Sequence, residues 1–112
     1  MAKVEIKESL KEEIIKKFKA ESIEIFEQMH SLEDNPQKGK LLGQVGGVAI
    51  KELRYKSYRF YFITDGFKIR MLEKEKLSDL LIRFVRMSDK KTQQKVIDEI
   101  KTILRTFGEE GL

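Results

Sequence analysis

The sequence contains no cysteine, no tryptophan, one proline and one histidine among its 112 residues. The absence of cysteine excludes a disulfide framework and a thiolate zinc site, and it fits a reducing cytosol or a hot habitat. A ribonuclease mechanism that uses one imidazole as base and another as acid is excluded, because His30 is the single histidine. We therefore expect no metal at the functional site.

Targeting and cofactor motifs are missing as well. The amino-terminal stretch MAKVEIKESL has no apolar core of a secretion signal, and no run approaches the roughly 18 apolar residues of a membrane helix. VGGV lacks the helix start that a phosphate-binding loop requires, and no nucleophile elbow occurs. We expect a cytoplasmic protein with no membrane contact and no small-molecule cofactor.

Charged residues are abundant, at 38% of the chain, and their balance is a net charge of +4. Such a composition, dominated by lysine and glutamate, is typical of thermophile surfaces with ion-pair networks. A net charge of this size favours an anionic partner only if the cations cluster on one surface. The length suits one domain, residues 1–112.

Hydrophobic periodicity predicts an α+β fold. The stretch VEIKES suggests a short edge strand, and a 3.6-residue stripe predicts a helix over 10–33, either continuous or broken near Ala20–Ser22. Asn35-Pro36 ends it, and NPQKGKLLGQVGG is interpreted as a loop. Alternation then predicts strands near 48–54, 58–62, 67–71 and 80–87, with an Asp65-Gly66 hairpin, before a helix at 92–106.

The predicted architecture is a twisted antiparallel sheet in the order β-α-β-β-β-β-α, with the helices on one face. Side chains alternate along a strand, so if Tyr58, Phe60 and Phe62 face the helices, Arg59 and Tyr61 face away. A bulge near residues 50–54 would add Arg54 to that open face. The cations and the aromatic residue that we expect to bind RNA there or at its rim are Tyr61, Lys68, Arg70, Arg83, Lys90 and Lys91.

Two interpretations of this face are open. One is a solvated sheet surface balanced by glutamates; the other is a groove for phosphates, since arginines interleaved with an aromatic suit an anionic polymer with stackable bases. Cleavage of RNA by its own 2′-hydroxyl needs neither metal nor histidine, because fixed arginines can stabilise the charge of the pentacoordinate phosphate. Lys51 or Tyr61 would move the proton if nearby cations lower its pKa.

The segments IKELR, SYRFYF and FVRMSDKKTQQKVIDEI, in this order after LEDNP and GKLLG, resemble the RelE/ParE toxin superfamily of type II toxin–antitoxin modules. The resemblance covers about residues 10–103. It implies a RelE/HigB-like toxin, a ribosome-dependent mRNA endonuclease that inhibits translation and is silenced by a cognate antitoxin protein. Its partners would be that antitoxin, the ribosome and mRNA.

By the same resemblance, the catalytic arginines would be Arg54, Arg59 and Arg86, with Arg83 as an alternative to Arg86. The base that takes the proton would be Lys51, with its pKa lowered by Arg54. The chain has no tyrosine after Tyr61, whereas many RelE members carry one near the carboxyl terminus. Two alternatives therefore stay open: a ParE-like toxin that binds a protein target such as gyrase without cutting RNA, and an inactive toxin-like remnant.

Overall fold

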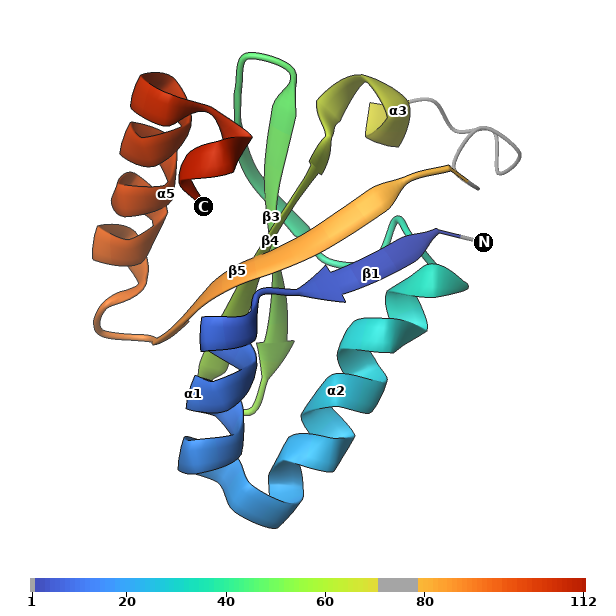
Figure 1. Ribbon diagram of the computed structural model, residues 1–112, viewed down its shortest axis with the longest axis vertical. Helices are drawn as coiled ribbons and strands as arrows, with labels where there is room; N and C mark the ends of the chain where they lie inside the picture. The colour runs from blue at the N-terminus through green and yellow to red at the C-terminus, as the bar shows by residue number, and fades with distance from the viewer. Residues whose placement is uncertain (1, 71–78) are drawn as a thin grey trace.

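The computed structural model describes residues 2–70 and 79–112, which form an α+β domain around a mixed sheet (Figure 1). Within these residues the sheet has five strands in the order β1-β5-β4-β3-β2. The strands are β1 (Lys3–Ile6), β2 (Lys40–Val45), β3 (Val48–Tyr55), β4 (Tyr58–Asp65) and β5 (Leu81–Asp89). The neighbouring pairs from β5 to β2 are antiparallel, whereas β1 pairs with β5 in parallel.

The helices are α1 (Glu8–Phe18), α2 (Ser22–His30), α3 (Gly66–Arg70) and α5 (Gln93–Phe107). The predicted 10–33 helix is thus two helices, separated at Lys19–Glu21 by a 3₁₀ turn. Lys19 has a positive φ of 52°, and the Ser22 hydroxyl donates to its carbonyl, which together end α1 and start α2. The alternative with a break near Ala20–Ser22 is confirmed.

One core lies between the sheet and the α1–α2 pair. Phe60, Phe62 and Phe84 have no exposed surface and pack there with residues of both helices. The rings of Phe62 and Phe84 are 4.9 Å apart in a tilted arrangement, and Phe18 packs edge-on against Tyr58. The prediction that the even-numbered aromatics of 58–62 face these helices is confirmed.

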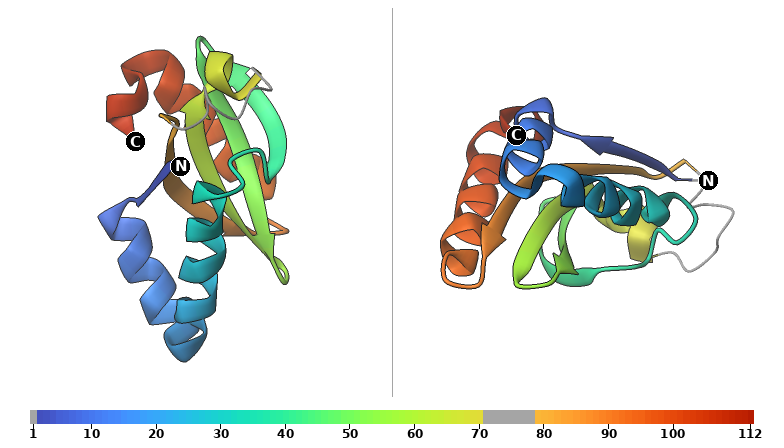
Figure 2. Two further views of the ribbon diagram at one scale, coloured as in Figure 1. Left: turned by 90° about the vertical axis from the view of Figure 1, so that its right-hand side faces the viewer. Right: turned by 90° about the horizontal axis from the view of Figure 1, so that it is seen from below.

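The second core lies on the other face of the sheet, where α5 packs (Figure 2). Ile50, Ile63 and Val85 contribute from the strands, and Ile97, Ile100 and Leu104 contribute from α5. The prediction that all helices cover one face is therefore wrong. The apolar stripe of α5 needs a sheet face of its own, because the α1–α2 pair already occupies the first.

Several strand predictions are also corrected. Asp65-Gly66 is not a hairpin turn: Asp65 Oδ1 accepts the backbone N–H groups of Phe67 (2.9 Å) and Lys68 (3.0 Å) and starts the short helix α3. The predicted strand at 67–71 is helical as far as residue 70, and residue 71 lies outside the described residues. The same carboxylate that would favour a turn instead satisfies the free N–H groups of a helix start.

The predicted loop NPQKGKLLGQVGG contains strand β2. This strand is at the sheet edge, and its register against β3 shifts between Leu41 and Gly43, so that Leu42 is an extra residue. A bulge moves successive side chains out of strict alternation, and an edge strand lacks a buried face to mark it. The sequence therefore has no period-two signal there.

Candidate nucleic-acid interface

Two arginines lie directly opposite each other on the α5 side of the sheet. In the antiparallel β3–β4 ladder, Arg54 pairs with Arg59 and Glu52 pairs with Tyr61. Their side chains share a face with Ile50 and Ile63, which pack under α5. The β3–β4 register is regular from residue 48 to 65, so the bulge expected near residues 50–54 is absent and is not needed to place Arg54.

A bulge in β5 brings a third arginine to this face. Tyr61 pairs with Arg86 and Phe62 pairs with Phe84, which leaves Val85 as the extra residue. Without the bulge, Arg86 would share the face of Phe84; with it, Met87 packs into the α1–α2 core instead. Bulges commonly re-aim a side chain next to functional sites. We call Arg54, Arg59 and Arg86 the arginine face.

Arg59 is the most enclosed member of the arginine face, at 6% exposure. Its Nη1 donates to the Ser57 carbonyl at 2.9 Å. Its Nε is buried and has no hydrogen-bond partner among the described residues. Burying a guanidinium is costly unless it is paired. Arg59 therefore carries an uncompensated cost, because the described residues provide no acceptor for its Nε.

Glu52 is a buried carboxylate on the arginine face, and it did not figure among the predicted site residues. Its side chain has no exposed surface, and its Oε1 lies 3.3 Å from Nε of Arg54, whose side chain is 56% exposed. Its Oε2 is buried without a partner in the described part of the chain. The one available signal was that Glu52 is the single carboxylate among the cations of residues 50–62.

Tyr61 is completely buried, so it does not lie on an open face as predicted. Its hydroxyl lies 2.6 Å from the Ser88 hydroxyl. Burial raises the pKa of Tyr61, the hydrogen bond with Ser88 opposes this, and the charge of Glu52 adds to the rise. Tyr61 is thus a neutral phenol beneath the arginine face. Its ring is not exposed for an RNA base to stack on, and its hydroxyl is not a proton acceptor.

Lys51 lies on the opposite face of the sheet. Its Nζ donates to the carbonyls of Gln37 (3.0 Å) and Lys38 (3.2 Å), and it lies 5.8 Å from the centre of the Phe62 ring. Burial lowers the pKa of Lys51. The structure therefore does not bring Lys51 together with the arginine face, because residues 51 and 54 are an odd number of positions apart on a regular strand.

The other predicted RNA-binding cations are spread along the sheet. Lys90 and Lys91 are exposed in the link between β5 and α5, at the end where Arg59 lies. Lys68 is on α3 beyond the other end of β4, roughly 20 Å from Arg59 by strand rise. Arg70 ends α3, and its side chain lies outside the described residues. Arg83 pairs with Ile63 on the α5 side.

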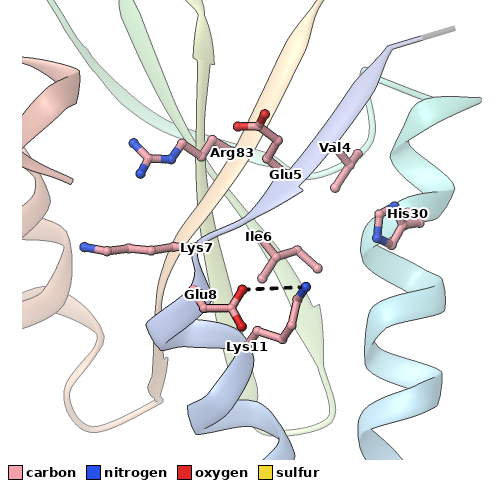
Figure 3. A pocket seen from close by; sticks show the side chains of 8 residues that line it. All are labelled: Val4, Glu5, Ile6, Lys7, Glu8, Lys11, His30 and Arg83. Atoms are coloured by element: carbon pink, nitrogen blue, oxygen red, sulfur yellow. Dashed lines mark ion pairs between the residues drawn. The ribbon is translucent and has the colours of Figure 1, made fainter.

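Lys7 extends the positive charge of this face to β1, and it too was absent from the predicted site. Glu5 pairs with Arg83, and the Lys7 N–H donates to the Phe84 carbonyl at 2.9 Å, so Lys7 follows Glu5 on the α5 side. Partial burial and the nearby charges of Arg86 and Arg83 lower the pKa of Lys7. Lys7 and Arg83 both line an open pocket of about 570 Å³ (Figure 3).

The arrangement as a whole is suited to an anion. Like charges directly opposite in a sheet are destabilising, and here two arginines are opposed with a third diagonal to Arg59.

Within residues 2–70 and 79–112 no group of acidic residues or histidine could hold a metal ion. None of the helices in that same part of the chain is long and apolar enough to cross a membrane.

Comparisons with protein-family models, with curated proteins and with solved structures find no match for this chain.

Proposed function

We propose that this protein is an RNA-cleaving toxin of the RelE/ParE type, a metal-independent endoribonuclease that acts on ribosome-bound mRNA in the cytoplasm and is neutralised by a cognate antitoxin. The observation that carries this proposal is the arginine face, on which the register of three adjacent strands gathers Arg54, Arg59 and Arg86. Three guanidiniums on one rigid sheet face suit a phosphate that gains charge during reaction. The resemblance of the surrounding segments to that superfamily supports the same conclusion.

The chemistry would be attack of a 2′-hydroxyl on the adjacent phosphate, with the ribose oxygen of the next nucleotide as the leaving group. Arg59, the most buried of the three arginines, would bind the nonbridging oxygens. Arg86 would stabilise the leaving oxygen from the neighbouring strand. Each donor that acts only in the transition state contributes about 10²–10³ in rate.

The proton of the 2′-hydroxyl needs an acceptor on the same face. Lys51 is directed to the other side of the sheet, whereas Glu52 lies beside the arginines with Oε2 unpartnered among the described residues. Arg54 Nε contacts Glu52 Oε1 at 3.3 Å, and the Arg54 side chain is half exposed. A phosphate that attracts the Arg54 guanidinium would open Glu52 to the substrate, so we assign Glu52 rather than Lys51 as the base.

A non-nuclease toxin that binds a protein target such as gyrase is the second candidate. Its supporting observation is that Arg59 is 6% exposed and Tyr61 is buried, which leaves little of either side chain on the surface for a nucleotide. In that case the exposed cations Arg54, Lys90 and Lys91 would contact the partner, and Arg59 would be structural.

The test is induced expression in bacteria without a partner, followed by primer-extension mapping of cellular mRNA. We expect growth arrest and cuts at codon-related positions for the wild type, and neither for a folded Arg59→Ala variant. Arrest with intact mRNA would establish the second candidate instead. No arrest from a folded wild type would indicate an inactive toxin-like protein.

A further inference from the structure

A separate group of cations lies at the β1 edge of the α5 face. Figure 3 shows the side chains of Lys7 and Arg83 extending in the same direction, away from His30 and α2. They come from adjacent parallel strands, in which Glu5 pairs with Arg83 and Lys7 follows two residues later. We call Lys7 and Arg83 the Lys7 site; Arg86 lies between this site and Arg59.

Neither Lys7 nor Arg83 forms an ion pair with a carboxylate of the described residues, although Glu5 is the register partner of Arg83 and lines the same pocket. The carboxylate of Glu5 lies 3.5 Å from Lys3, and that of Glu8 lies 3.9 Å from Lys11. Arg83 Nη1 contacts the Glu109 carbonyl at 3.5 Å, which is a weak hydrogen bond to a neutral group. Burial lowers the pKa of Lys7, and the nearby charges of Arg86 and Arg83 lower it further.

The position of the Lys7 site relates it to the arginine face. Strands β1 and β3 are three strand spacings apart, roughly 14 Å, and Arg86 on β5 and Arg59 on β4 lie between them. The cations thus form an oblique line across four strands, because Arg86 pairs with Tyr61, two residues along β4 from Arg59, and Arg59 pairs with Arg54. A polyanion can follow such a line, whereas a single phosphate at Arg59 leaves the Lys7 end unfilled.

We propose that the Lys7 site is a second phosphate-binding site, which holds a flanking phosphate of the same single-stranded RNA and thereby sets a minimum length for the substrate. This inference rests on the proposed function and deepens it. The Lys7 site contributes binding of the chain and takes no part in bond cleavage, so its loss raises the KM for long RNA and leaves kcat unchanged.

The experiment measures binding of fluorescent 2′-O-methyl oligouridines by anisotropy over a range of salt concentrations. These RNAs lack the attacking hydroxyl and are not cut. A dinucleotide, a tetranucleotide and an octanucleotide are compared. For the wild type we expect affinity to rise with length. For Lys7→Gln we expect that rise to be lost, with a salt slope for the octanucleotide smaller by about 0.7 units, the value for one phosphate contact on a single strand.

The matched control is Lys3→Gln, which removes the same charge from the same strand and face but from a lysine already paired with Glu5. It should bind all lengths as the wild type does. Arg83→Gln is the second variant of the Lys7 site and should behave as Lys7→Gln does, with thermal melts showing that both are folded.

Two negative outcomes are distinguishable. If Lys7→Gln and Arg83→Gln match Lys3→Gln at every length while Arg59→Ala weakens binding of all three RNAs, the Lys7 site is overturned and the proposed function stands. If the folded wild type neither binds an oligonucleotide nor cuts ribosome-bound mRNA, the proposed function fails and the Lys7 site fails with it.

Discussion

Arg54 and Arg59 lie directly opposite one another in the β3–β4 ladder, and both side chains leave the sheet on the α5 side. A cross-strand pair of like charges lowers stability by roughly the amount that an opposite-charge pair would add, about 0.2–1 kcal/mol. Glu52 offsets part of this through Arg54 and leaves Arg59 without an ion pair of its own in the described residues. The stability of the fold does not explain why two arginines are placed opposite each other. Binding of an anion would require that placement.

The β5 bulge predicts which arginine serves as the third member of the site. Arg86 pairs with Tyr61 and is a diagonal neighbour of Arg59, whereas Arg83 pairs with Ile63, two positions further along β4. We expect Arg86→Ala to lower the rate of ribosome-bound mRNA cleavage by about 10²–10³-fold. Arg83→Ala should lower it by about tenfold or less, through weaker binding. Equal losses in kcat for the two variants would contradict the assignment.

Lys51 is predicted to be structural. Lys51→Met removes two hydrogen bonds from a charged donor to the loop carbonyls of Gln37 and Lys38. Allowing for the buried charge that also disappears, we expect a loss of about 1–3 kcal/mol in the free energy of unfolding, measured by urea titration. Cleavage per folded molecule should stay within about twofold of the wild type, because Lys51 is remote from the arginine face; a loss of 10²-fold or more in a folded variant would restore it as the base.

The pH dependence of the same pair of proteins tests the burial of Lys51. Its folded-state pKa lies below 10.5, its ordinary value. Between the two pKa values the unfolded chain binds more protons than the folded chain, so stability rises with pH in that window. The stability of the wild type relative to Lys51→Met should therefore increase as the pH approaches 10.5 from below. A difference that is constant with pH would mean that Lys51 is not desolvated.

The sequence predicted one face of strand β4 correctly and the other face incorrectly. Alternation along 58–62 correctly assigned Phe60 and Phe62 to the α1–α2 core, because large apolar side chains mark a buried face. It could not show that the other face is also covered, since Arg59 and Tyr61 are polar and are buried all the same. The packing of Tyr61 against residues of α5 is a tertiary fact, and the pattern of polar residues does not reveal it.

Which residues share the arginine face depends on how the strands are paired, and the amino-acid sequence does not show that pairing. The extra residue Val85 moves Arg86 to the face of Arg59, and nothing in LIRFVRMSD marks a bulge at that residue. Strand order was equally hidden: Lys7 lies on the same sheet face as the arginines because β1 pairs with β5, more than seventy residues later. Arg54 and Arg59 were correctly placed together because a short β-hairpin fixes their register locally.

Replacing Gly39 is predicted to destabilise the loop whose carbonyls accept hydrogen bonds from Lys51. Its φ is +102°, and a Cβ there would lie 2.9 Å from the Glu52 carbonyl oxygen and 3.0 Å from the Phe62 ring. Gly39→Ala should therefore lower the free energy of unfolding by about 2–4 kcal/mol, from backbone strain together with overpacking. Gly46→Ala is the control, since its φ is also positive but nothing lies within 4 Å of the added carbon.

The control should cost about 1 kcal/mol, the strain of a left-handed conformation alone. Chemical denaturation of both variants would measure the difference. Equal effects would show that the loop moves to make room for the Gly39 methyl group, so that it does not hold Lys51 rigidly.

The last prediction separates a functional role for Arg59 from a structural one. Arg59 is buried, makes a hydrogen bond of 2.9 Å to the Ser57 carbonyl, and faces Arg54 across the ladder. Replacing a poorly paired buried charge with an apolar side chain of similar volume is often neutral or stabilising. Arg59→Met should therefore unfold at the same urea concentration as the wild type or a higher one, while its cleavage of ribosome-bound mRNA falls by about 10²-fold or more. Arg59→Lys should also lose most activity, because an ammonium cannot replace the bidentate contact of a guanidinium. A destabilisation of about 3 kcal/mol or more in Arg59→Met, with activity per folded molecule preserved, would instead make Arg59 a structural residue and transfer the RNA-binding role to the exposed cations.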